Sequence, residues 1–250
     1  MKTRLSLPGS LAALAVSLSV LCQAQSGSAP APVRVRTQIV RVRPEMVNEW
    51  INLQKSEVVP ALKKGGVATR TVYQTNIGNG FEFMIVTPFA KFAEFDADGA
   101  QLKALGAAAN ARLGEKQRKC IESTSNWVST QLPALSNNPN NIFSAPKSIL
   151  TRIRVAPGKM QEFQALVKSD LLPAFKKGKQ DVAVFVRGFG ANPNDIVLSS
   201  PIAKYADLDS PPPFVQALGQ EGMAKLVARF ESMGSIVEQT VRTRLADLSF

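Results

Sequence analysis

Residues 55–65 read KSEVVPALKKG, and residues 168–178 read KSDLLPAFKKG. The offset is 168 − 55 = 113 positions, and the same offset joins PFAKFAEFD at 88–96 to PIAKYADLD at 201–209. Self-similarity at a fixed period indicates a duplicated structural unit. The sequence therefore predicts two copies of one unit, aligned without insertion or deletion.

The repeat also defines the expected domain organisation. The pattern Leu-x-x-Leu-Ser closes both copies, the first at Ser136 and the second at Ser249. We expect repeat 1 at 33–136 and repeat 2 at 149–250. The segment at 137–148 is rich in Asn and Pro, which predicts a linker that lets the copies associate face to face.

The first 24 residues resemble a secretory signal peptide. Lys2 and Arg4 form a basic start, an apolar run follows at 11–21, and Ala24 ends a small-residue cleavage site. The run is shorter than the roughly 20 apolar residues that span a bilayer. We expect cleavage near Ala24 and a periplasmic or secreted protein; in the alternative, a lipoprotein, Cys22 would be acylated.

The net charge is strongly positive, +11 for the whole sequence. Removing Lys2 and Arg4 leaves 30 − 2 = 28 basic side chains against 19 acidic ones, or +9. This charge favours anionic neighbours, for example an anionic envelope surface or an acidic small molecule. The basic residues are scattered and few aromatics lie among them, so we expect no nucleic-acid partner. Oligomerisation beyond one chain is left open.

The chain contains no histidine. This excludes the Ser-His-Asp triad, histidine-ligated zinc and a haem iron held by a proximal histidine, so we expect no metal and no cofactor. Cleavage near Ala24 would leave Cys120 without a disulfide partner. We interpret Cys120 as a buried helix position, with a reactive thiol as the alternative.

Each copy has the pattern strand, helix, strand, strand, helix, strand. In repeat 1 the expected elements are a strand at 35–42, a helix from Pro44 to Gly65, strands at 69–75 and 81–87, a helix at 101–122 and a strand at 126–132. In repeat 2 they are a strand at 149–155, a helix from Pro157 to Gly178, strands at 182–189 and 195–200, a helix at 214–239 and a strand at 239–245. Pro60 and Pro173 should bend the last turns of the first helices, because proline cannot donate a helical hydrogen bond.

Another proline pair follows the third strand of each copy. We expect Pro88 and Pro201 to start short helices, in which Phe92 and Tyr205 are the buried anchors.

This order is that of a ferredoxin-like βαββαβ unit, an α+β fold with a four-stranded antiparallel sheet and both helices on one face. The second face of the sheet needs a cover. A second copy provides it, so we expect an intramolecular pseudo-dimeric α/β barrel.

The order and the duplication resemble the dimeric α/β-barrel superfamily, in particular its NIPSNAP-like and antibiotic-biosynthesis-monooxygenase-like branches. The residues that carry the resemblance are VAPGKMQEF at 155–163, the stretches at 168–178 and 201–209, and their first-half counterparts. The resemblance implies two half-sites, each a pocket between a sheet and its helices, in families that bind small apolar or aromatic molecules. Its haem-dependent members generally use a histidine ligand, which is absent here.

A specialised site should lie where the copies differ, since the shared residues are explained by the fold. In the gapless alignment Tyr73 stands opposite Val186, and Gln74 stands opposite Arg187. These positions lie on the second strand of each copy, which we therefore expect to line the pockets.

Our first hypothesis is a binding protein for a small apolar or weakly anionic ligand. Trp50, Arg70 and Tyr73 would line one sheet–helix pocket, and Phe163 and Arg187 the other. In the alternative interpretation, Trp50 and Phe163 are ordinary core residues.

Two other classes of protein stay open. The first is a cofactor-independent oxygenase or isomerase, whose acid and base would come from Tyr73, Glu57, Asp170 or a lysine. The second is a structural or interaction protein of the cell envelope with a solid barrel. No catalytic residue can be assigned from the sequence.

Overall fold

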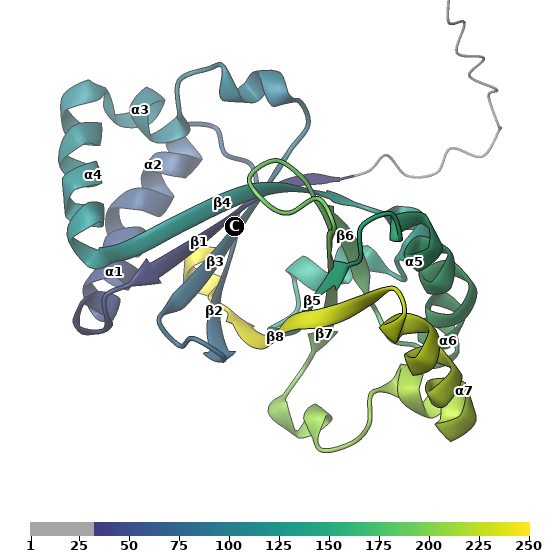
Figure 1. Ribbon diagram of the computed structural model, residues 1–250. Helices are drawn as coiled ribbons and strands as arrows, with labels where there is room; N and C mark the ends of the chain where they lie inside the picture. The colour runs from purple at the N-terminus through teal and green to yellow at the C-terminus, as the bar shows by residue number, and fades with distance from the viewer. Residues whose placement is uncertain (1–32) are drawn as a thin grey trace, which may run out of the picture.

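A computed structural model describes residues 33–250, in which eight antiparallel strands close into a barrel (Figure 1). The predicted signal peptide at 1–24 lies outside the described residues. Around the barrel the strand order is β1-β3-β2-β8-β5-β7-β6-β4, so each repeat contributes four adjacent strands. The strands are β1 Arg34–Val42, β2 Thr71–Ile77, β3 Glu82–Phe89, β4 Ile121–Gln131, β5 Lys147–Val155, β6 Ala183–Arg187, β7 Asp195–Ile202 and β8 Gly234–Arg244.

The helices cover the outside of the barrel, those of repeat 1 on one side and those of repeat 2 on the other (Figure 1). They are α1 Val47–Leu53, α2 Val59–Lys64, α3 Ala100–Leu105, α4 Ala107–Cys120, α5 Met160–Leu166, α6 Leu172–Lys177 and α7 Pro213–Glu231. The α+β class with its ferredoxin-like element order is confirmed. None of the helices within 33–250 is long and apolar enough to cross a membrane.

Pro60 and Pro173, in the first helix region of each repeat, each follow a π-helical segment. A π-helical segment, Gln54–Val58, joins α1 to α2 and leads into Pro60, and Val167–Leu171 does the same before Pro173. A π turn shifts the hydrogen-bond pattern, so each helix continues past a residue that has no backbone N–H to donate.

The interfaces between sheet and helices are filled by large side chains. Trp50 of α1 is 1% exposed and its ring centroid lies 4.3 Å from that of Phe83. Phe163 of α5 is fully buried in the matching cluster of repeat 2. The closing tails cross over: Leu248 packs in the cluster of Trp50, and Leu135 packs in the cluster of Phe163. Each repeat therefore completes the core of the other.

The register of β2 and β6 corrects the gapless alignment. Tyr73 pairs with Met84, and Phe185 pairs with Val197. The strands β3 and β7 keep the offset, 197 − 84 = 113, whereas β2 and β6 are related by 185 − 73 = 112. Repeat 2 has one residue fewer before β6 and one more in the following hairpin, and because these changes cancel, the sequence comparison missed both.

Hydrogen bonds from the closing Leu-x-x-Leu-Ser segments of the two repeats show independently that β2 and β6 are related by 112 positions. The backbone N–H of Val72 donates to Oγ of Ser249, and that of Val184 donates to Oγ of Ser136, both at 3.0 Å. The acceptors differ by 113 positions and the donors by 184 − 72 = 112. The structural counterpart of Arg187 is therefore Thr75, not Gln74, and that of Tyr73 is Phe185, not Val186.

The short helices after β3 and β7 differ from the prediction. Pro88 and Pro201 lie inside the strands, because β1 and β5 extend far enough to pair with them. The turns that follow are single 3-10 turns, and Phe92 and Tyr205 are 44% and 42% exposed. Phe92 packs against neighbouring surface aromatics such as Phe89 instead of the core, so the prediction of buried anchors was wrong.

The last strands begin earlier than predicted. α4 ends at Cys120 and β4 starts at the next residue, while α7 ends at Glu231 and β8 starts at Gly234. The second helices are broken near Gly106 and Gly219, as predicted, where positive φ angles of 74° and 68° favour glycine.

The predicted linker, 137–148, belongs to the barrel. Asn137 forms a bridge to Val182, a 3-10 helix follows at Pro139–Phe143, and β5 already begins at Lys147. Within it Ile142 is 2% exposed and packs with residues inside the barrel. The segment is therefore part of the core rather than a free tether.

Candidate functional site

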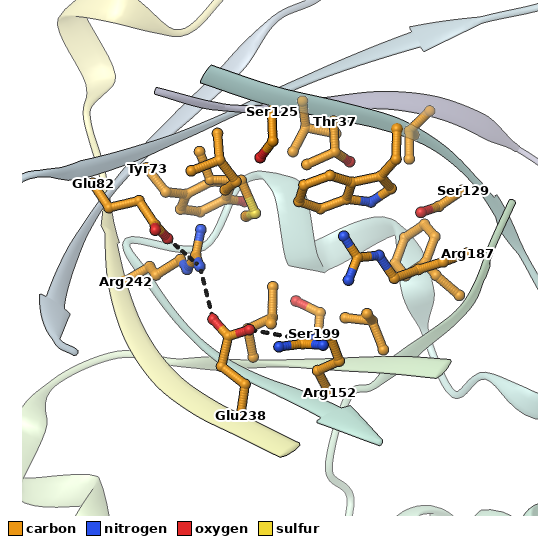
Figure 2. Close-up of a pocket in the computed structure, with 18 of the residues that line it drawn as sticks. Thr37, Tyr73, Glu82, Ser125, Ser129, Arg152, Arg187, Ser199, Glu238 and Arg242 are labelled. Atoms are coloured by element: carbon orange, nitrogen blue, oxygen red, sulfur yellow. Dashed lines mark hydrogen bonds and ion pairs between the residues drawn. The ribbon is translucent and has the colours of Figure 1, made fainter. Parts of the chain in front are cut away.

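The barrel encloses a cavity of about 630 Å³ (Figure 2). Strands of both repeats and the 3-10 helix at Pro139–Phe143 form its wall. Its lining residues are Val35, Thr37, Ile39, Arg41, Tyr73, Glu82, Met84, Val86, Ser123, Thr124, Ser125, Trp127, Ser129, Ile142, Phe143, Leu150, Arg152, Phe185, Arg187, Val197, Ser199, Glu238 and Arg242.

The cavity changes from apolar to charged along the barrel axis. Its lining on β1 runs from Val35 to Arg41, and its lining on β5 runs from Leu150 to Arg152. Neighbouring strands alternate in direction, so β1 and β5, four strands apart, point the same way. The charged residues of both repeats therefore gather at one end, and Ile142 belongs to the apolar lining.

At the charged end, Arg242 is held by two carboxylates. Its Nη2 lies 3.0 Å from Oε1 of Glu82 and 3.6 Å from Oε1 of Glu238. The other oxygen of Glu238 accepts a 2.9 Å hydrogen bond from Nε of Arg152 (Figure 2). Burial lowers the pKa of Arg242, and Glu82 and Glu238 oppose this effect. Arg242 is thus a buried cation with two counter-ions.

Asp195 is the centre of a second cluster. Its Oδ2 lies 3.3 Å from Nη1 of Arg152 and 3.3 Å from Nη1 of Arg187, and its Oδ1 is bound by Nε of Arg154. Burial alone would raise the pKa of Asp195, but hydrogen bonds from Arg154 and Arg152 outweigh it and the pKa is lowered. One ionised carboxylate therefore forms ion pairs with three arginines.

Arg187 is fixed by stacking as well as by charge. Its guanidinium carbon lies 3.8 Å from the ring centroid of Trp127. Its Nε is buried and has no hydrogen-bond partner among residues 33–250, and the same holds for Nη1 of Arg242. Two buried donors near one cavity are thus left unsatisfied, which costs free energy.

Tyr73 joins the apolar wall to the linker. Its hydroxyl donates to the carbonyl oxygen of Ile142 at 3.0 Å. Burial raises the pKa of Tyr73 to about 12, with Arg244 acting in the opposite direction. The phenol is protonated at neutral pH and does not serve as a base there.

The structure brings two of the five predicted site residues together. Tyr73 and Arg187 line the same cavity, although the sequence placed them in different pockets. Trp50, Phe163 and Arg70 do not line it. The prediction of a sheet–helix pocket was wrong, because aromatic side chains fill both sheet–helix interfaces.

Arg70 contributes to the packing between the two repeats and not to the lining of the cavity. Its Nη2 donates to Oε1 of Gln54 at 2.8 Å, and its Nη1 lies 3.4 Å from the carbonyl oxygen of Leu248. Burial lowers its pKa to about 10. It ties the tail of repeat 2 to the helix side of repeat 1.

The sequence interpretation missed Arg152, Arg242, Glu238 and Trp127. A signal was present, because charged residues alternate with apolar ones in β5 and β8, as in the stretch RIRV. Such alternation is usually assigned to a solvated face. Only closure of the barrel turns that face inward.

Of the named acid and base candidates, Tyr73 lines the cavity, whereas Glu57 and Asp170 lie outside it. Glu57 pairs with Lys116 at 2.7 Å, and Asp170 pairs with Arg229 at 2.5 Å, both between outer helices. Residues 33–250 contain no group of three or more Cys, Asp or Glu side chains that could hold a metal ion.

No protein-family model matches the sequence, and a search of curated proteins finds no similar sequence. Solved structures do match. A "putative monooxygenase" from Lactobacillus acidophilus superposes with a TM-score of 0.52 at 11% identity, covering 87% of this chain and 95% of that one. An anthrone oxidase-like protein gives a TM-score of 0.53 at 11% identity, with coverages of 86% and 91%.

A NIPSNAP family protein from Agrobacterium tumefaciens matches 38% of this chain and 90% of its own, at 18% identity and a TM-score of 0.34. At these identities the comparisons show the fold alone. The fold is a ferredoxin-like barrel, and the resemblance found in the sequence is confirmed at the level of the fold.

Proposed function

We propose that this chain is an exported internal pseudo-dimer, released by cleavage near Ala24, that binds one small apolar or weakly anionic molecule inside its barrel. The observation that carries the proposal is the 630 Å³ cavity, with an apolar wall at one end and arginines at the other. Ligand pockets of about 300–1,000 Å³ typically combine an apolar lining with a few fixed polar groups.

The arrangement of the two repeats supports the pseudo-dimer. At one seam Thr75 pairs with Arg242, and at the other Arg187 pairs with Ser129. These pairs are equivalent under the offsets of 112 and 113 positions. A barrel filled with side chains, as expected of a purely structural envelope protein, would leave no such cavity.

Binding fits the geometry better than turnover does. The carboxylates that line the cavity, Glu82 and Glu238, are both engaged by arginines, and Tyr73 is protonated at neutral pH. General base catalysis needs an acceptor that can take a proton near the operating pH. The monooxygenase-like neighbours share the fold with this chain, and a shared fold does not transfer an activity.

Native mass spectrometry of the protein purified from its own host tests the proposal. Ser125 is an exposed residue of the cavity lining on β4, so Ser125→Trp should obstruct the cavity and release the bound molecule. Asn126→Trp is the matched control, because Asn126 is exposed on the same strand but is not part of the lining. The wild type and N126W should each carry one small molecule per chain. Identical masses for all three proteins after subtraction of the substitutions would refute the proposal.

A further inference from the structure

We infer that the molecule in the barrel is a carboxylic acid with an apolar body, and that its acid group binds between Arg152 and Arg187 beside Trp127. The inference rests on the proposed function and names the ligand class for the same cavity. Figure 2 shows Arg152 and Arg187 pointing into the cavity, which Tyr73 also lines.

The first argument is the charge balance. The network at the charged end holds five guanidinium groups against three carboxylates: Arg41, Arg152, Arg154, Arg187 and Arg242 against Glu82, Asp195 and Glu238. A cavity with an excess of fixed positive charge at one end favours an anion and disfavours a cation.

The second argument concerns which arginine carries the excess positive charge. Arg242 has two carboxylate partners, Glu82 and Glu238, and is 3% exposed. Arg187 has only Asp195, which it shares with Arg152 and Arg154, and its contact of 3.3 Å is long for a charged hydrogen bond. The shortage of negative charge is therefore on the side of Arg187.

The third argument is a guanidinium group that is fixed in direction and reaches the cavity. Stacking on Trp127 at 3.8 Å holds the guanidinium plane of Arg187, so its donors have a defined direction before any ligand arrives. The side chain of Arg187 is 11% exposed and lines the cavity, so part of its guanidinium group faces the space where a ligand would bind. A carboxylate is the group whose two oxygens match the guanidinium donors.

The fourth argument sets the stoichiometry. The counterparts of Arg152, Arg187 and Arg242 in repeat 1 are Ile39, Thr75 and Ser129, none of which carries a charge. The duplication therefore did not produce two anion sites. The acid group has one place to bind, and its apolar body is directed toward Phe185 and Val197.

Isothermal titration of the full chain with naphthoate and with its neutral amide tests the inference. The two probes share one apolar body and differ in charge. Naphthoate should bind at one per chain and more tightly than the amide. Arg187→Gln should weaken naphthoate about tenfold to a hundredfold, the range of a charge-assisted hydrogen bond, and should change the amide by less than about twofold.

Arg36→Gln is the control for net charge, because Arg36 is exposed and does not line the cavity. It should leave both probes within about twofold of the wild type. Equal affinities of naphthoate and amide for the wild type would overturn the inference while leaving a ligand-binding barrel intact, and this comparison decides even if R187Q does not fold. Binding of neither probe to the wild type would count against the proposed function itself.

Discussion

Replacing Tyr73 by phenylalanine removes a hydrogen bond that joins the wall of β2 to the linker. The hydroxyl donates to the carbonyl oxygen of Ile142 at 3.0 Å, and both residues are at most 3% exposed. The substitution leaves a buried carbonyl without this donor, which costs about 1–3 kcal/mol of the free energy of unfolding at neutral pH. The cavity keeps its shape, so affinity for an apolar ligand should be unchanged.

The stability advantage of the wild type over Y73F should shrink at high pH. Burial raises the pKa of Tyr73 to about 12 in the folded protein, above the value of about 10 for an exposed phenol. A group whose pKa is raised on folding stabilises fully below its unfolded pKa and loses that contribution as the pH rises through the folded pKa. Over this window the wild type should lose roughly 3 kcal/mol that Y73F does not lose.

Urea unfolding of both proteins between about pH 7 and pH 12 measures the difference directly. Groups common to both proteins, including Arg70 with its lowered pKa of about 10, cancel in the comparison. The wild type should be more stable at pH 7, and its advantage over Y73F should fall by about 1.4 kcal/mol between pH 7 and pH 11. A constant difference across the whole range would refute the claim that Tyr73 is buried as a neutral phenol.

Two further predictions concern the core. Leu248→Ala should lower the free energy of unfolding by about 2–5 kcal/mol, measured with urea, because Leu248 is fully buried in the core of the other repeat. Leu208→Ala is the control, because Leu208 is 39% exposed and its loss should cost less than about 1 kcal/mol. Equal losses would contradict the packing of the repeat 2 tail in the core of repeat 1. Cys120 is buried, and burial, with Glu49 second, raises the pKa of its thiol. In a C22S background it should therefore react with iodoacetamide on the order of a hundredfold more slowly in the folded than in the urea-unfolded protein, and equal rates would identify the reactive thiol instead.

Much of the fold could be predicted because the duplication makes each weak local pattern appear twice. The helix stripes that include Trp50 and Phe163 place these residues under their sheets, and both are buried there. The register of β2 and β6 could not be predicted, since a missing residue before β6 and an extra one after it cancel in the alignment.

The site was harder to predict than the fold. A strand exposes alternate residues to opposite faces, and the sequence does not say which face is enclosed. Arg152 and Arg242 look like surface residues until the barrel closes around them. Tyr73 and Arg187 were found because they differ between the copies, which is a signal of specialisation rather than of position.

The most direct test of the central claim is a crystal structure of the protein soaked with naphthoate. The account predicts one naphthoate per chain inside the barrel, with its carboxylate in hydrogen-bond contact with Arg187 and its rings against the apolar wall near Phe185. Naphthoate between a sheet and its helices, beside Trp50 or Phe163, would contradict it.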